Sequence, residues 1–293
     1  MITTLKSTLM IALAAAGMAG HAAAESGPYK VVVEEDPTLP EHVVYRPADI
    51  NGVKSGALPV YVFGNGACSH DGTSSRNHLA EIASHGYLVV APGIIPANHP
   101  APAEEQRQPG QLKASNSAES LTQAIDWALK ENGRSDSRYY GRVAADKVAA
   151  SGFSCGGLQA ISVARDPRIS TVVVMNSGVF NDGNPIAGIN VSKAMLADLH
   201  GSVIYVLGGP TDIAYNNGRD DYKRINHIPA AYVDIPVGHG GTYMEPNGGI
   251  GAEIVTAWLD WKLKGDASAA DKFSGESCGY CVDKRIIYEK KNF

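Results

Sequence analysis

Short runs of β-branched and other apolar residues alternate along the chain with longer segments whose apolar residues recur every three or four positions. The short runs predict strands, and the longer segments predict helices that bury one face. Regular alternation of the two is typical of an α/β protein with a mostly parallel sheet and helices on both faces. Eight strands are expected, at residues 29–35, 41–46, 59–63, 87–91, 147–151, 171–176, 202–207 and 230–235.

Local sequence signals predict a hairpin at the start of the sheet and the ends of two helices. Only a short turn separates the first two strands, so they are expected to form a hairpin ahead of the parallel units. Asn116, with Glu119 three residues later, predicts the start of one covering helix. Ile254 and Trp258 lie on one face of the last helix, which is expected to end before Gly265.

Two connecting segments are longer than a plain connection requires. They lie at residues 93–115, rich in Pro and Ala, and at residues 177–191, rich in Gly and Asn. Each follows the carboxyl end of an expected strand, where open α/β sheets place their ligand sites. We therefore expect both segments to wall a substrate cleft.

The N-terminus has the pattern of an export signal. Lys6 precedes an uncharged apolar stretch at residues 9–20, and three alanines ending at Ala24 follow it. This order predicts a signal peptide, residues 1–24, cleaved near Ala24 and a secreted or periplasmic product. Residues 25–293 are interpreted as one domain with a Cys-containing tail from about residue 266, and without a membrane span.

Charge and cysteine content narrow the possible partners. The formal net charge of −5 lacks the basic surface that nucleic acids and anionic membranes require. A small or uncharged partner is therefore expected, and no sequence feature indicates an oligomeric state. All four cysteines follow the predicted signal, so one or two disulfides are expected. The Cys278-x-x-Cys281 spacing, without a second ligand pair, favours a local disulfide over a zinc site.

The motif with the clearest chemistry lies at residues 152–157, which read Gly-Phe-Ser-Cys-Gly-Gly. This is a G-x-S-x-G pattern that follows an expected strand and precedes a helical segment. Small residues are needed there because the chain reverses sharply around Ser154. The pattern predicts that Ser154 is an exposed nucleophile, and an ordinary Gly-rich strand-to-helix loop is the alternative.

A serine nucleophile needs a base and a carboxylate that orients the base. Asp212 follows the strand expected at residues 202–207, and His239 follows the one at residues 230–235. The order Ser, Asp, His along the chain is the order found in α/β-hydrolases. We therefore predict a Ser154–His239–Asp212 triad. The substitutes for the carboxylate are Asp182, Asp220 and Asp221.

Acyl transfer also needs backbone N–H groups that stabilise an oxyanion. One is expected at Cys155, directly after the serine, and the other in the Gly-rich loop after the third strand, at Ala67 or Cys68. If Cys68 and Cys155 flank the same site, their side chains lie within reach of each other. We therefore hypothesise a Cys68–Cys155 disulfide that ties this loop to the serine turn.

With these residues, the chain resembles the dienelactone-hydrolase-like and polyester-hydrolase-like branch of the α/β-hydrolases. The similar segments are residues 82–87, 152–157, 166–168 and 238–240. The resemblance implies the α/β-hydrolase fold, a Ser-His-Asp triad, and hydrolysis of carboxylic esters without a metal or an organic cofactor. No large cap domain is expected.

Two departures from this branch bear on the substrate. Dienelactone hydrolases proper use a cysteine where this chain has Ser154, so their lactone substrate is not carried over. The polyester hydrolases usually place aromatic residues where this chain has Cys68 and Cys155. The expected partner is a small-molecule or polymeric ester of undefined acyl group.

The sequence thus predicts a secreted serine hydrolase that forms an acyl-enzyme on Ser154. Two alternatives stay open: a peptidase or amide hydrolase on the same triad, and a non-catalytic binding protein that retains the fold.

Overall fold

The computed structural model describes residues 25–100 and 112–293. The predicted signal peptide, residues 1–24, lies outside the described residues. Among the described helices, none combines the length and the apolar character needed to cross a membrane.

A nine-stranded sheet forms the centre of the structure, with the order β1-β2-β4-β3-β6-β7-β9-β10-β11. Pairing is parallel from β4 through β10, whereas β1, β2 and β11 pair antiparallel with their neighbours at the two edges. The strands are β1 (Val31–Glu35), β2 (His42–Pro47), β3 (Leu58–Gly64), β4 (Leu88–Pro92), β6 (Val143–Phe153), β7 (Ile169–Met175), β9 (Ser202–Leu207), β10 (Ala230–Asp234) and β11 (Ile287–Lys291).

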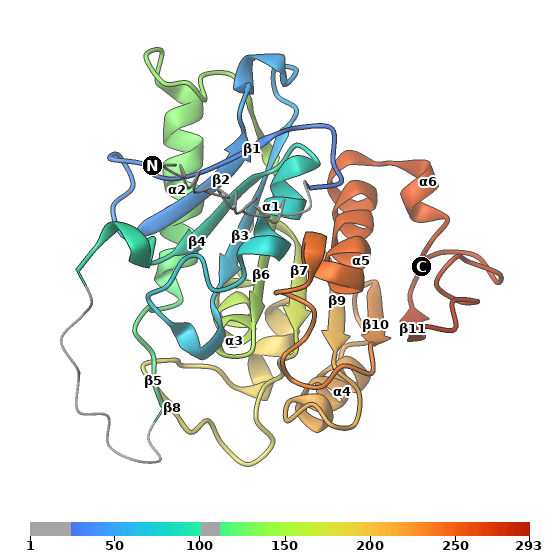
Figure 1. The fold of residues 1–293 in the computed structure, drawn as a ribbon. Coiled ribbons are helices and arrows are strands. Elements are labelled where there is room, and N and C mark those ends of the chain that lie inside the picture. The colour runs from blue at the N-terminus through green and yellow to red at the C-terminus, as the bar shows by residue number, and fades with distance from the viewer. Residues whose placement is uncertain (1–24, 101–111) are drawn as a thin grey trace, which may run out of the picture.

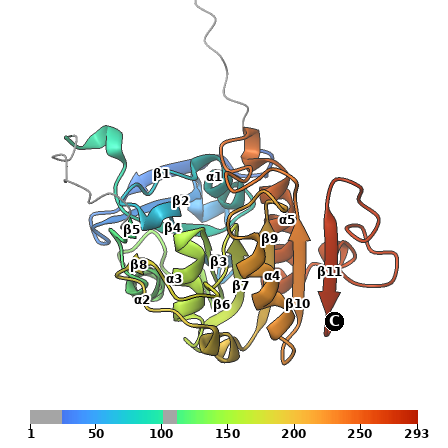
Figure 2. The same ribbon diagram turned by 90° about the horizontal axis from the view of Figure 1, so that it is seen from below.

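Helices lie on both faces of this sheet, as Figures 1 and 2 show. The helices are α1 (Arg76–Ser84), α2 (Glu119–Gly133), α3 (Cys155–Val163), α4 (Tyr215–Arg224), α5 (Gly249–Leu259) and α6 (Ala267–Ala270). Short 3-10 helices lie at Ile50–Gly52, Gly66–Cys68, Pro96–Asn98, Lys193–Asp198 and Pro246–Gly248. The predicted α/β class, with a mostly parallel sheet and helices, is confirmed.

Two hydrophobic clusters, one on each face, hold the layers together. In β3, Val60 and Val62 face the cluster that α2, α3 and α4 cover, whereas Tyr61 and Phe63 face the cluster that α1 and α5 cover. This alternation follows from the two-residue period of a strand. Because both faces are buried, β3 is apolar at nearly every position, which is typical of a central parallel strand.

The predicted number of eight strands is wrong, because β11 adds a ninth. This strand lies in the C-terminal tail and pairs antiparallel with β10, so that Asp234 lies opposite Ile287. Its sequence, Ile-Tyr-Glu-Lys-Lys, is polar because the strand lies at an edge of the sheet. Edge strands of this kind lack the apolar run that predicts a buried strand.

The predicted cap of α2 is also wrong. The helix begins at Glu119, and its N-cap residue Ala118 makes no side-chain cap hydrogen bond. Asn116 instead bonds to the loop that follows β3: its Nδ2 donates to the carbonyl oxygen of Ser69 at 2.6 Å. Its side chain therefore fixes one loop to another.

The two long segments meet at the carboxyl end of the sheet. They pair there as a separate two-stranded ribbon made of β5 (Leu112–Lys113) and β8 (Ile186–Ala187), which Figure 1 shows beyond the ends of the main strands. The Ala114 N–H extends the ribbon by donating to the carbonyl oxygen of Ala187 at 2.9 Å.

Candidate active site

Ser154, Asp212 and His239 come together at the carboxyl end of the sheet. Ser154 follows β6, Asp212 follows β9, and His239 follows β10. The Oγ atom of Ser154 lies 3.0 Å from Nε2 of His239. On the other side of the same ring, Nδ1 lies 2.6 Å from Oδ1 of Asp212. The three side chains therefore form one hydrogen-bonded line.

The turn that presents Ser154 is strained and tightly packed. Ser154 has φ 55° and ψ −116°, a backbone conformation that is rare for a residue with a side chain. A Cβ atom on Gly152 would lie 2.2 Å from the carbonyl group of Gly156, and one on Gly156 would lie 1.9 Å from the carbonyl oxygen of Gly64. Both positions thus need glycine, which allows β6, β3 and α3 to meet closely. Ser177 Oγ also donates to the Ser154 carbonyl oxygen at 2.6 Å.

Asp212 is buried and fully hydrogen-bonded. Its Oδ1 accepts from the N–H of Ala214 at 2.9 Å, and its Oδ2 accepts from the N–H of Gly208 and from Asn176 Nδ2, each at 2.9 Å. Burial pushes the pKa of Asp212 upward, but the hydrogen bonds, first that to His239, outweigh it and hold the pKa below its ordinary value. The carboxylate is therefore charged and fixed in orientation.

Asn176 is a site residue that the sequence analysis missed. Its Nδ2 donates both to Asp212 Oδ2 at 2.9 Å and to the carbonyl oxygen of Gly238 at 3.2 Å. Its Oδ1 accepts from the hydroxyl of Tyr243 at 2.7 Å. Asn176 therefore joins the loop of the carboxylate to the loop that carries His239. Its position, directly after β7 and between the strands of Ser154 and Asp212, is the signal that could have found it.

The orientation of His239 follows from its two neighbours. A charged Asp212 on the Nδ1 side favours the tautomer with the proton on Nδ1, which leaves the Nε2 lone pair facing Ser154. The ring of Phe153 packs against it, with centroids 5.3 Å apart, and Tyr243 supports Phe153 at 4.5 Å. The imidazole is thereby held on both its polar and apolar sides.

The three residues predicted as backbone donors lie close to Ser154, but the N–H group of one of them already donates to another acceptor. Cys155 is the first residue of α3, and it lines the same cavity as Ala67 and Ser154. The N–H of Cys68, in contrast, donates to the carbonyl oxygen of Asn65 at 3.1 Å. Of the two candidates in this loop, Ala67 is therefore the one whose position fits a donor.

The four cysteines form two disulfides. Cys68 is bonded to Cys155, with their Cα atoms 5.3 Å apart, and Cys278 is bonded to Cys281. The first bond is buried and joins the loop after β3 to the start of α3. The structure therefore contains the pairing hypothesised from the sequence, and the Cys278-x-x-Cys281 segment is a local clip.

A cavity of about 370 Å³ opens beside Ser154. It is lined by Gly66, Ala67, Ser74, Leu112, Phe153, Ser154, Cys155, Ile186 and His239. None of these described lining residues is Asp, Glu, Lys or Arg. The surroundings of Ser154 are consequently apolar apart from the imidazole and the hydroxyl groups.

The three alternative carboxylates are either exposed or paired with basic residues. Asp182 is exposed in the loop after β7. Asp220 pairs with Lys193 at 2.9 Å and with Arg224 at 2.7 Å. Asp221 pairs with Lys193 at 2.6 Å, and burial raises the pKa of Asp221 to about 6. Among the three, none occupies the position of Asp212 on His239.

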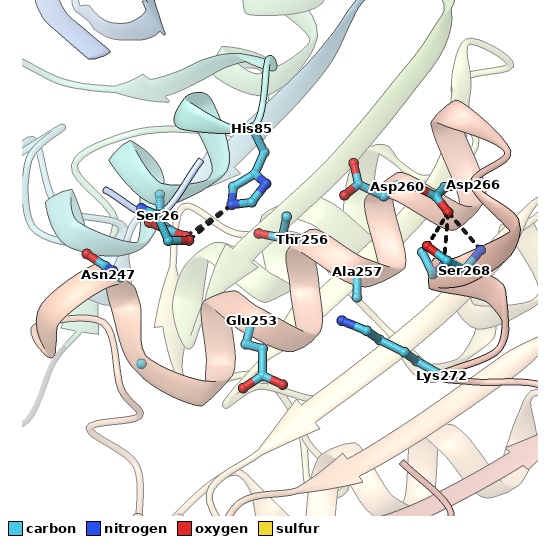
Figure 3. A pocket seen from close by; sticks show the side chains of 13 residues that line it. Ser26, His85, Asn247, Glu253, Thr256, Ala257, Asp260, Asp266, Ser268 and Lys272 are labelled. Atoms are coloured by element: carbon cyan, nitrogen blue, oxygen red, sulfur yellow. Dashed lines mark hydrogen bonds and ion pairs between the residues drawn. The ribbon is translucent and has the colours of Figure 1, made fainter. Parts of the chain in front are cut away.

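A second cavity, of about 270 Å³, contains another serine close to a histidine (Figure 3). Ser26 Oγ lies 3.3 Å from Nε2 of His85, and Glu81 Oε1 lies 3.1 Å from that same nitrogen. Ser26 also donates to Glu81. Because the carboxylate and the hydroxyl share one ring nitrogen, this cluster lacks the two-sided arrangement around His239.

Within residues 25–100 and 112–293, no three His, Cys, Asp or Glu side chains are grouped as metal ligands would be. No model of a known protein family and no curated protein matches this chain.

Proposed function

We propose that this chain is a serine hydrolase of the α/β-hydrolase type that cleaves carboxylic esters through an acyl-enzyme on Ser154. The observation that carries the proposal is the hydrogen-bonded line from Ser154 Oγ through His239 to Asp212, with distances of 3.0 Å and 2.6 Å. A partly exposed serine on a strained turn, an oriented base and a charged carboxylate are the groups that acyl transfer requires.

The first half of the reaction transfers the acyl group to the serine. His239 Nε2 takes the proton of Ser154 Oγ while this oxygen attacks the carbonyl carbon of the ester. The N–H groups of Cys155 and Ala67 donate to the oxygen that becomes negative. When the tetrahedral intermediate collapses, the imidazolium gives the proton to the leaving alcohol, and the acyl group stays on Ser154.

The second half returns the serine to its starting state. His239 takes a proton from water, whose oxygen attacks the acyl carbon of the ester on Ser154. Collapse of the second intermediate releases the carboxylic acid and returns the proton to Ser154 Oγ. Asp212 stays ionised and stabilises the imidazolium that forms in each half.

The proposal includes export from the cytoplasm. Two disulfides, of which Cys68–Cys155 is buried, support an oxidising compartment such as the periplasm or the exterior. The signal peptide predicted at residues 1–24 would direct this export.

Steady-state hydrolysis of p-nitrophenyl butyrate by Ser154→Ala tests this proposal. Removal of the hydroxyl is expected to lower kcat by about four orders of magnitude or more, since the acyl-enzyme cannot form. Ser26→Ala is the matched control, because Ser26 also lies beside a histidine, and it is expected to keep the activity of the unaltered protein. Ester hydrolysis that survives in Ser154→Ala and is lost in Ser26→Ala would contradict the proposal.

A further inference from the structure

The β5–β8 ribbon places two apolar side chains beside Ser154. Leu112 and Ile186 lie opposite each other in the ribbon, and both line the cavity of about 370 Å³. They come from the two long segments that follow β4 and β7, so the chain brings together two distant parts of the sequence to build this wall.

The ribbon is fixed to the part of the site that carries the backbone donors. The N–H groups of Ser115 and Asn116 donate to the carbonyl oxygen of Cys68 at 3.0 Å and 3.2 Å. Gln159 in α3 donates to the carbonyl oxygen of Asn116 at 2.8 Å. The wall therefore has a defined position relative to Ser154, as a specificity-determining element requires.

Leu112 is too exposed to contribute to the hydrophobic core, although it lines the cavity beside Ser154. Its side chain is 57% exposed, whereas its ribbon neighbour Ile186 is 8% exposed. A leucine on the rim of the cavity gains burial only when an apolar group enters beside it. Phe153 and Cys155 line the same cavity and continue its apolar surface towards Ser154.

The chemistry of the lining defines the group that fits. Because the described lining residues include no carboxylate, ammonium or guanidinium group, a charged acyl group would enter without a partner. The volume lies at the small end of the range for ligand pockets. We propose that the β5–β8 ribbon is the acyl-binding wall, and that Leu112 and Ile186 select an uncharged, apolar acyl group of short to medium length. This inference rests on the proposed function.

Charge placed on the wall tests the inference. For Leu112→Asp, the ratio of kcat/KM for p-nitrophenyl butyrate to that for the acetate is expected to fall about tenfold, since the longer chain meets a carboxylate. For Leu112→Lys, hydrolysis of a hemisuccinate ester is expected to rise about tenfold relative to the butyrate, because the ammonium pairs with the terminal carboxylate. Folding should be unaffected, because Leu112 is mostly exposed.

The matched control is Val282→Asp, which puts the same charge on a side chain that is 67% exposed in the C-terminal tail. It is expected to leave both substrate ratios unchanged. Ile186→Val removes one methyl group from the other half of the wall and is expected to move the preferred acyl chain to a longer one.

Equal substrate ratios in Leu112→Asp, Val282→Asp and the unaltered protein would overturn the inference, as would a preference of the unaltered protein for palmitoyl esters. Labelling of Ser154 by a small fluorophosphonate separates the two proposals. Labelled, ester-cleaving protein with unchanged ratios contradicts the acyl wall alone, whereas protein that neither labels nor cleaves esters contradicts both.

Discussion

Two opposing physical effects determine the pKa of the Asp212 carboxylate. Its burial favours the neutral acid, and its hydrogen bonds to His239, Ala214, Gly208 and Asn176 favour the charged form. The hydrogen bonds outweigh the burial, so the pKa lies below its ordinary value. At the scale of the residue, this keeps the orienting charge present whenever the imidazole is neutral.

The decrease of kcat/KM at low pH should consequently reflect the uptake of a single proton. The lowered pKa of Asp212 keeps this carboxylate ionised until the pH is well below neutral, so Asp212 adds no second proton to the loss of kcat/KM above that range. We expect log kcat/KM to fall with a slope of one on the acid side, measured with an uncharged ester. A slope of two in that range would show that Asp212 titrates together with the imidazole.

Asn176 provides a test of the positioning role of its amide. Asn176→Asp places a second carboxylate 2.9 Å from Asp212 Oδ2, and this like charge raises one of the two pKa values. The acid limb of kcat/KM is expected to become steeper and to move to higher pH.

Asn176→Gly is the companion variant, because it removes the amide while allowing the φ of 43° at this position. It is expected to lower kcat about tenfold or more without moving the acid limb. If Asn176→Asp keeps the pH profile of the unaltered protein and Asn176→Gly keeps its kcat, Asn176 does not act through Asp212.

At the scale of the elements, the sequence predicted the parts that depend on local apolar pattern. The central strands and the serine turn could be predicted because β3 and residues 148–150 of β6 are apolar runs, and because a side chain at Gly152 or Gly156 would collide with the backbone. The ribbon could not, since a two-residue pairing such as that of Leu112 with Ile186 has no local signature. Likewise, Asn176 follows from the way strands are arranged in space rather than from any motif.

The two disulfides should differ in what they stabilise. Cys68–Cys155 closes a loop with a sequence separation of 87, and Cys278–Cys281 closes one of 3. Cys68→Ala with Cys155→Ala should lower the free energy of unfolding by about 4 kcal/mol, and Cys278→Ala with Cys281→Ala by about 2 kcal/mol, in denaturant titrations.

The two double cysteine variants should also differ in kcat. Loss of the first disulfide frees the loop of Ala67 from the start of α3, so kcat is expected to fall about tenfold or more. The second disulfide lies in the tail, and its loss should leave kcat unchanged. Equal effects of both double variants on kcat would contradict a role of Cys68–Cys155 in holding the donors.

At the scale of the whole molecule, the C-terminal tail completes the layer outside α5. Phe273 is fully buried, and its ring centroid lies 5.2 Å from that of Trp258 in α5 and 4.9 Å from that of Tyr280 in the tail. The tail then adds β11 to the edge of the sheet. The strand pattern missed this part because its apolar residues are scattered, so their common packing appears only in the folded chain.

Phe273→Ala is therefore expected to affect stability and not activity. The cavity left among aromatic rings should lower the free energy of unfolding by about 3–5 kcal/mol, measured in denaturant. Because the tail contributes no residue to the described lining of the Ser154 cavity, kcat/KM should stay the same at temperatures where the variant is folded. Val282→Ala, on an exposed part of the same tail, should change stability by less than about 0.5 kcal/mol.

The central claim is that His239 activates the hydroxyl of Ser154, and covalent labelling tests it most directly. Folded protein is treated with a small fluorophosphonate, and the adduct is located by peptide mass spectrometry. The account predicts one adduct, on the peptide that contains Ser154, formed much more slowly in His239→Ala and absent in Ser154→Ala. An unlabelled Ser154 in folded protein, or an adduct on Ser26 in its place, would contradict it.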